Sequence, residues 1–253
     1  MASPRFGDAL GHGMSDKRID ILRGIGRSGS ISQAAREATV SYKAAWQAVA
    51  TLTNLAGVPL VERAVGGAGG GGASLTAHGA QLLELADALD AARRAVQSRA
   101  GAGAGIAAAR LAIRTSMRNQ LPAVVGAIES TGRIVRVHMK LGAAQQQQQA
   151  VAARITRESA ELLGLAEGMA AIALCKATAV RVERAATQRR SKGNQLGGVV
   201  ESAARGEDGD EIAIVLDSGL QLVGFAPAGS GLRTRQRVVA AIDESAVVLA
   251  LPG

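Results

Sequence analysis

The spacing of apolar residues divides the chain into a helical first part and a second part rich in strands. Ile19, Leu22 and Ile25 recur at helical spacing in the first of three expected helices, which ends at Gly29. Beyond Arg110 the apolar residues instead alternate with polar ones, as in the stretches RIVRVHMKL and EIAIVLDSGLQLVGF. The pattern predicts an α+β multidomain protein in which helices precede an all-β region.

Two short helices joined by a tight turn are expected before Gly57. Ser30 is a suitable N-cap for the first, with Gln33 three residues later as in a capping box, and Ser41 is a suitable N-cap for the second. The face that the second helix is expected to bury consists of Ala45, Val49 and Leu52. This arrangement is typical of a helix-turn-helix.

A hairpin and a long helix are expected next. The stretches VPLVERAVG and ASLT are interpreted as two strands separated by a run of glycines. The helix that follows, expected over about residues 77–99, carries an apolar stripe that needs a partner, most simply the same helix of a second subunit. The stripe consists of Leu82, Leu85, Leu89 and Ala92.

The glycine run, VERAVGGAGGGGASLTAHG over residues 61–79, is best explained by its position after the helix-turn-helix. A phosphate-binding P-loop needs a Lys after the glycines, and none is present. A dinucleotide fingerprint needs a βαβ unit, and a plain linker gives no reason for the two flanking strands. The hairpin is therefore expected to be the wing of a winged helix, with its tip along the DNA backbone and Arg63 near a phosphate.

The second helix of the helix-turn-helix carries the residues expected to reach DNA. Ser41, Tyr42, Lys43 and Gln47 lie on its early, exposed side, where side chains contact base edges and phosphates in the major groove. Tyr42 fits core packing as well as it fits DNA binding, and Trp46 is expected to pack in the core. A solvated surface lysine is the simpler alternative for Lys43, but a phosphate contact fits this position better.

Composition adds an anionic partner to this picture. The formal net charge is +8 and the isoelectric point about 10.7, which indicates a nucleic acid or a small oxyanion, although a solvated basic surface gives the same values. Cys175 is the single cysteine, which excludes an intrachain disulfide and fits the cytoplasm. We expect no structural zinc site, no membrane span and no enzyme, since no nucleophile lies beside a base.

The β region contains an internal repeat. RNQLPAVVGAIES at 118–130 matches GNQLGGVVESAAR at 193–205, and GMAAIALCKATAV at 168–180 matches RQRVVAAIDESAV at 235–247. The glutamine run at 145–149 is expected to be a loop. The expected domains are a disordered arm over 1–15, a winged helix and dimerisation domain over 16–100, a linker over 101–110, and two β units over 111–184 and 185–253.

These motifs resemble the molybdate-responsive transcriptional regulators of the ModE type. GSISQAAREATVSYKAAWQAV and LVERAVGGAGGGGASLTAHG are similar to the S-Y-K-x-A-W recognition helix and glycine-containing wing of that family, and the resemblance runs from about Lys17 to the C-terminus. It implies tandem small, OB-like β-barrels of the Mop or TOBE kind that bind molybdate. It also implies a cytoplasmic homodimer that binds an inverted-repeat operator on double-stranded DNA and typically represses molybdate-uptake genes. A molybdate storage or buffering protein is the alternative.

The stretch RTSMRNQL carries the donors that a tetrahedral dianion such as molybdate needs, namely hydroxyls, an amide and a cation. These candidates are Thr115, Ser116, Arg118 and Asn119. The resemblance adds a second set, of which the first two would come from another subunit: Thr156, Ser159, Lys176 and Ala177. Simpler alternatives exist, because Arg118 could pair with a carboxylate, Thr156 and Ser159 could cap a helical turn, and Lys176 could be a surface lysine.

The second copy of the repeat lacks these cations. Gly193 stands at the position of Arg118, and Asp243 at that of Lys176, so an acid replaces a cation. The oxyanion is therefore expected in the first copy, and the second copy is expected to be mainly structural. Further binding there stays open, because Asn194 is retained with Ser191 and Lys192 beside it, and the resemblance implies that both copies can contribute to further sites. Tungstate, with the same charge and nearly the same size, is expected to bind as well. Sulfate and phosphate are smaller, and the size of the cavity and its lining of donors are expected to reject them.

Overall fold

The structure is a computed structural model of the 253-residue chain. It describes residues 17–64, 72–97, 115–142, 149–185 and 193–251. The expected arm, the glycine-rich tip over 65–71, the expected linker over 101–110 and the glutamines at 145–148 lie outside these described residues. Two compact units are present, the first made of Met1–Ile113, Arg157–Leu165 and Pro252–Gly253, and the second of Arg114–Thr156 and Ala166–Leu251.

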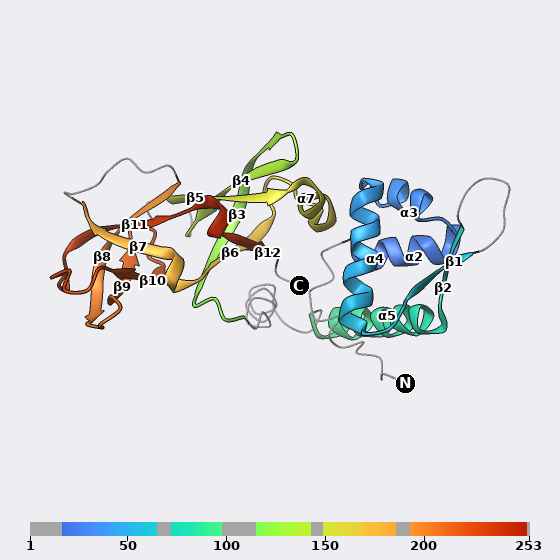
Figure 1. The fold of residues 1–253 in the computed structure, drawn as a ribbon, viewed down its shortest axis with the longest axis horizontal. Coiled ribbons are helices and arrows are strands. Elements are labelled where there is room, and N and C mark those ends of the chain that lie inside the picture. The colour runs from blue at the N-terminus through green and yellow to red at the C-terminus, as the bar shows by residue number, and fades with distance from the viewer. Residues whose placement is uncertain (1–16, 65–71, 98–114, 143–148, 186–192, 252–253) are drawn as a thin grey trace. The chain divides into compact units, whose positions relative to one another are not determined.

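Three helices build the centre of the first unit (Figure 1), and they are α2 (Arg18–Ser28), α3 (Ile31–Glu37) and α4 (Tyr42–Ala56). Helix α2 ends at Gly29, whose left-handed φ of 64° suits glycine. Ser30 Oγ accepts a hydrogen bond from the Gln33 N–H at 3.3 Å, and Ser41 Oγ accepts one from the Ala44 N–H at 3.2 Å. The helix boundaries expected from these caps are confirmed.

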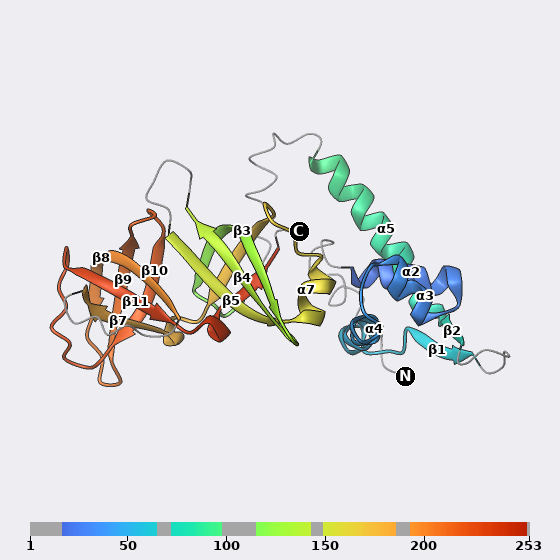
Figure 2. The same ribbon diagram turned by 90° about the horizontal axis from the view of Figure 1, so that it is seen from above.

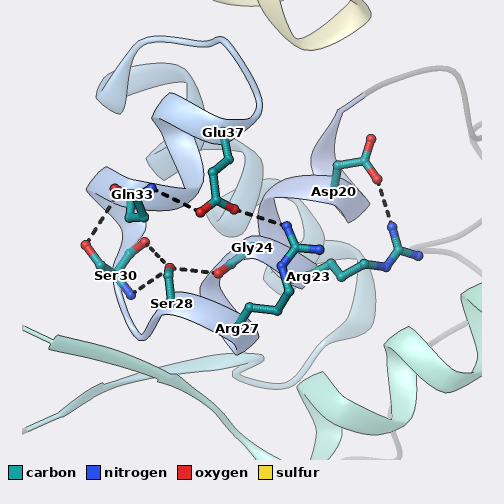
Figure 3. Close-up of polar contacts among 8 residues, drawn as sticks. All are labelled: Asp20, Arg23, Gly24, Arg27, Ser28, Ser30, Gln33 and Glu37. Atoms are coloured by element: carbon teal, nitrogen blue, oxygen red, sulfur yellow. Dashed lines mark hydrogen bonds and ion pairs between the residues drawn. The ribbon is translucent and has the colours of Figure 1, made fainter.

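Figure 3 shows the polar contacts that connect α2 with α3. Arg27 Nη2 and Gln33 Nε2 both donate to the Glu37 carboxylate, at 3.0 and 3.1 Å. The hydrogen bond from Gln33, followed by that from Arg27, lowers the pKa of Glu37. The Gln33 side chain therefore binds Glu37, and only the Ser30 half of the expected capping box forms.

The core of this unit is made of alanine and aliphatic residues. Helices α3 and α4 pack through small buried residues, namely Ala34, Ala35, Ala44, Ala45 and Ala48. A second cluster is fully buried between α2, α4 and α5 (Ala77–Gln97), and it includes Leu22, Leu52, Leu60 and Leu82. The alanines let α3 and α4 approach closely, and the leucines fill the space between α2, α4 and α5.

The expected hairpin is present as β1 (Val61–Ala64) and β2 (Gly72–Leu75), paired antiparallel with Val61 opposite Leu75. Helix α5 follows and can be seen beside the hairpin in Figure 2. The expected apolar stripe of α5 is only partly used within the unit. Leu82 is buried, whereas Leu85 and Leu89 are 36% and 46% exposed. No described helix is both long and apolar enough to cross a membrane.

The second unit is built from the two copies of the repeat. The first copy supplies β3 (Asn119–Thr131), β4 (Ile134–Leu141), β5 (Gln149–Thr156), β6 (Ala170–Cys175) and β7 (Val180–Arg184). The second supplies β8 (Asn194–Ala204), β9 (Asp210–Leu216), β10 (Gln221–Ala226), β11 (Arg237–Ile242) and β12 (Val248–Ala250). Short 3₁₀ turns, η1 (Ala177–Ala179) and η3 (Glu244–Ala246), follow β6 and β11 at equivalent places.

The two copies exchange their last strands. Strand β7 joins a closed barrel of order β10-β7-β11-β8-β9, and β12 joins a five-stranded sheet of order β12-β6-β3-β4-β5. Two small β units were expected, and the structure has one closed barrel and one five-stranded sheet. The expected boundary between residues 184 and 185 thus separates the copies along the sequence, whereas each folded sheet contains a strand from both copies.

Candidate functional site

Helix α4 has one buried and one exposed face. The buried face is lined by Ala44, Ala45, Ala48 and Leu52. The expected DNA-contacting residues Ser41, Lys43 and Gln47 are exposed, and Tyr42 is 54% exposed. Trp46 is 49% exposed, so the expectation that it packs in the core is wrong. At about 100° per residue, position 46 lies on the side of the helix away from the buried alanines.

Two carboxylates of α7 (Arg157–Leu163), a helix of the first unit, contact the start of α4. Lys43 Nζ lies 2.7 Å from Glu158 Oε1, and the Ser41 N–H donates to Glu161 Oε2 at 2.8 Å. The Lys43 side chain is still 66% exposed, and that of Glu158 is 14% exposed. Residues that the sequence assigns to DNA are thus held by acidic side chains in this structure.

Arg63 lies on β1 opposite Ala73 of β2, which places this residue at the base of the hairpin beside the glycine-rich tip. The backbone position is the one expected for a wing residue. Arg63 and the expected recognition helix α4 lie on different elements. In a winged helix, such an arrangement lets the helix and the wing contact neighbouring parts of a duplex.

The cationic candidates Arg118 and Lys176 adjoin the same end of two paired strands in the five-stranded sheet. Asn119 of β3 and Cys175 of β6 are partners in the antiparallel pairing. Arg118 directly precedes the first and Lys176 directly follows the second, so both residues leave the sheet at the same end. Lys176 is exposed at the start of η1, and Ala177 behind it is 6% exposed.

The hydroxyl candidates Thr115 and Ser116 precede this end of β3 and are exposed. Thr115 Oγ1 accepts a hydrogen bond from the Met117 N–H at 3.3 Å, which closes a short turn before the strand. The sheet therefore presents two hydroxyls and two cationic side chains at a single end, a donor set suited to an oxyanion.

Arg118 forms an ion pair that uses both of its terminal nitrogens. Nη1 lies 2.6 Å from Glu211 Oε2, and Nη2 lies 3.2 Å from Glu211 Oε1. The hydrogen bond from Arg118 lowers the pKa of Glu211, and the same contact raises the pKa of Arg118. Pairing with a carboxylate was the simpler alternative for Arg118, and Glu211 is that carboxylate in this structure.

Asn119 is buried and joins the two copies of the repeat. Its Nδ2 donates to Val223 O and its Oδ1 accepts from the Val223 N–H, both at 2.8 Å. Asn194 repeats the arrangement, because its Nδ2 donates to Ala152 O at 2.8 Å and its Oδ1 accepts from the Ala152 N–H at 2.6 Å. Both side-chain amides thus join the two copies. Asn119 therefore has a structural role, although it is also one of the expected oxyanion ligands.

Thr156 and Ser159 belong to the opposite end of the sheet. Thr156, the last residue of β5, pairs with Ile134, which pairs in turn with Thr131 at the far end of β3 from Asn119. A straight strand of this length spans roughly 40 Å. Ser159 follows on α7. A single chain therefore does not bring Thr156 together with Arg118 and Lys176.

The second copy presents an acid where the first presents a cation. Asn194 pairs with Ile242 as Asn119 pairs with Cys175, so Asp243 occupies the position of Lys176 in the fold as well as in the sequence. The Asp243 carboxylate accepts from the Ser245 N–H at 2.7 Å, and its hydrogen bonds with Ser245 lower its pKa. This position is unsuited to a dianion because the two negative charges repel each other.

Sequence reasoning did not find the acidic partners Glu158, Glu161 and Glu211. They lie far along the chain from the residues that they contact, so no local motif marks them. Cys175 is buried, and burial raises the pKa of its thiol. Across the described ranges, no three His, Cys, Asp or Glu side chains gather where they could hold a metal ion.

Comparisons with known proteins agree with both parts of the fold. The model of the bacterial regulatory helix-turn-helix protein, lysR family, matches residues 17–80, and the TOBE domain model matches residues 115–182. The molybdenum transport protein ModE of Azotobacter vinelandii is 34% identical over 259 residues, covering 96% of this chain and 94% of the relative. The DNA-binding transcriptional dual regulator ModE of Escherichia coli K12 is 32% identical over 243 residues, covering 92% of each.

A solved structure is also similar. The cytoplasmic molybdate-binding protein ModG, crystallised with molybdate bound, superposes with a TM-score of 0.50 at 28% sequence identity. The match covers 55% of this chain and all of that one. The likeness therefore concerns a part of this chain about as long as its β region.

Proposed function

Because the chain belongs to the ModE family of transcriptional regulators, we propose that it is a DNA-binding regulator that senses molybdate and acts as a homodimer in the cytoplasm. The observation that supports the proposal is the position of Arg118 and Lys176 next to the same end of two paired strands, in a region that matches the TOBE domain model. The same chain carries a winged helix in which the start of the expected recognition helix is exposed. Sensor and DNA-binding element are thus parts of one polypeptide.

The winged helix binds the operator. The exposed start of α4 enters the major groove, where Tyr42, Lys43 and Gln47 contact bases and phosphates, and Ser41 caps the helix. Arg63 at the base of the wing contacts the backbone outside the groove. Each subunit binds one half-site, so a two-fold symmetric dimer binds an inverted repeat.

The oxyanion binds between two subunits. One subunit supplies Thr115, Ser116, Arg118 and Lys176, together with the backbone at Ala177. The partner supplies Thr156 and Ser159, which lie at the other end of the sheet and are not brought to the cations within one chain. Asn119 holds the strand that carries Arg118. The exposed Leu85 and Leu89 of α5 support a dimer, because a second α5 would cover them.

Regulation follows from the position of the ligand. A dianion bound between subunits favours one arrangement of the dimer, and this arrangement sets how well the two DNA-binding domains fit two half-sites. We assign the oxyanion-bound protein to repression of molybdate-uptake genes. Tungstate binds in the same way, since hydroxyl and cationic donors do not separate two dianions of equal charge and similar size.

Calorimetric titration of the full-length protein with molybdate, with sulfate as the competing anion, tests the sensor. Molybdate is expected to bind, sulfate to bind much more weakly, and Arg118→Ala to abolish most of the molybdate affinity. Arg136→Ala is the matched control, because Arg136 makes a similar two-pronged pair with Glu244 elsewhere in the unit. Equal affinity for both anions would contradict the proposal. Molybdate binding without salt-dependent DNA binding would instead favour a storage protein.

A further inference from the structure

Aromatic residues are scarce in this protein, and two of them lie together on α4. The chain has one Trp, one Tyr and two Phe among 253 residues. The Trp and the Tyr are Trp46 and Tyr42, one helical turn apart, and they are 49% and 54% exposed. The largest apolar side chain of the protein is thus half in solvent, while α4 contributes only alanines to the core cluster that it shares with α2 and α3.

Trp46 lies within the exposed arc of the recognition helix. At about 100° per residue, position 46 falls between Tyr42 on one side and the polar pair Lys43 and Gln47 on the other. The opposite face of α4 is closed by Ala44 and Ala48, which are fully buried. Folding of the unit therefore leaves the exposed half of the indole without an apolar partner, and a binding partner on this face would cover it.

We propose that Trp46 recognises thymine in the operator through apolar contact with the C5-methyl group. The proposal rests on the proposed DNA-binding function, which places this face of α4 in the major groove. The thymine methyl is the one apolar group among the base edges in that groove. An apolar side chain at this place therefore favours T·A over C·G, whereas Lys43 and Gln47 supply the polar contacts around it. Tyr42 extends the apolar surface by one turn.

The operator is first obtained without assumption about its sequence. The full-length protein, with molybdate present, selects from duplexes that contain a randomised central region. The selected sequences are expected to contain two inverted half-sites with an invariant thymine in each. Deoxyuridine is then placed at that thymine, which removes only the methyl group and keeps every hydrogen-bonding group of the base pair.

The deoxyuridine duplex is expected to bind wild-type protein about fourfold more weakly per half-site, as loss of one buried methyl group predicts. Trp46→Ala is expected to bind the thymine duplex about tenfold more weakly and to bind both duplexes equally. Gln47→Ala is the matched control, since it is exposed on the same face, and it should weaken binding while keeping the difference between duplexes. Deoxyuridine outside the half-sites should have no effect.

Equal binding of both duplexes by the wild-type protein would overturn the assignment. This measurement uses only the wild-type protein, so it does not depend on the folding of a variant. Unchanged affinity of Trp46→Ala would also overturn it. Failure to select any sequence would overturn the DNA-binding function itself. That outcome differs from selection of a sequence whose thymines prove dispensable.

Discussion

Arg118 and Glu211 form a two-pronged ion pair, with nitrogen–oxygen distances of 2.6 and 3.2 Å, at the end of the sheet where the oxyanion is proposed to bind. Glu211 follows the buried Asp210 on strand β9, and both partners of the pair are partly exposed. The carboxylate uses the guanidinium N–H groups that a dianion would use. At the proposed site, Glu211 would therefore compete with the oxyanion for Arg118.

Glu211→Gln should raise the affinity for molybdate about three- to tenfold, because it removes a negative charge beside the dianion and releases Arg118. Calorimetric titration at fixed ionic strength measures the change. Glu244→Gln, which removes the equivalent carboxylate from Arg136, should leave the affinity unchanged. Weaker binding by Glu211→Gln would show instead that the carboxylate holds Arg118 in the binding orientation.

Asn119→Ala and Asn194→Ala should each destabilise the second unit by about 2–4 kcal/mol, since each removes two hydrogen bonds to a backbone N–H and C=O, part-buried at Val223 and buried at Ala152. Urea unfolding followed by circular dichroism measures both. The pair also separates structure from ligand binding at Asn119. Asn194 lies in the second copy, so its loss should reduce stability without a specific loss of molybdate affinity. A larger affinity loss in Asn119→Ala than in Asn194→Ala would assign Asn119 to the ligand.

The local features of the fold could be predicted because each depends on a few neighbouring residues. Ser30 and Ser41 cap helices through backbone N–H groups three residues away, and Gly29 ends α2 in a conformation that glycine adopts without strain. The duplicated β unit was visible because Asn119 and Asn194 head two similar strands. These predictions needed no knowledge of what lies across the core.

The features that could not be predicted depend on residues distant in the sequence. Trp46 was assigned to the core because large aromatics are usually buried, but alanines already close the space behind α4. The exchange of β7 and β12 was not visible because a strand pattern does not name its pairing partner. The ion pair of Arg118 with Glu211 could not be predicted, because Glu211 lies 93 residues further along the chain.

Asp217 should make the second unit sensitive to acid. The hydrogen bond from Arg237 lowers its pKa. A carboxyl whose pKa is lower in the folded than in the unfolded state stabilises the fold fully above the unfolded value of about 4, and the effect is lost as the pH falls through the folded pKa. Asp217→Asn should therefore lower the urea midpoint at pH 7, and its difference from wild type should shrink below about pH 4. A constant difference at every pH would exclude the charge as its cause.

A chain that ends at Val247 lacks β12 and should lose stability in the five-stranded sheet. Leu249 and Leu251 are 7% and 8% exposed, and burial of two leucines contributes about 3–6 kcal/mol. The thermal midpoint of the second unit should fall by about 10 °C, and the exposed edge of β6 should promote aggregation. Val248→Thr is the control, because Val248 is 41% exposed and its change should have little effect. An unchanged midpoint would mean that β12 contributes little to the sheet.

The ion pair of Lys43 with Glu158 joins α7 to the helix that is proposed to bind DNA. If its ammonium contacts a phosphate, Lys43→Ala should weaken binding to all duplexes alike and reduce the slope of log affinity against log salt by about 1. In this structure the Lys43 ammonium lies 2.7 Å from Glu158 Oε1, so a phosphate contact requires that this ion pair is broken first.

Glu158→Gln should then strengthen DNA binding about threefold at low salt, with the gain falling as salt screens the charge. Asp87→Asn removes the same charge from an ion pair with Arg23 in the same unit, and it controls for a general effect of net charge. Fluorescence anisotropy of a labelled duplex, titrated at several salt concentrations, measures all three variants. An equal gain from Asp87→Asn would attribute the effect to net charge and remove Glu158 from the control of DNA binding.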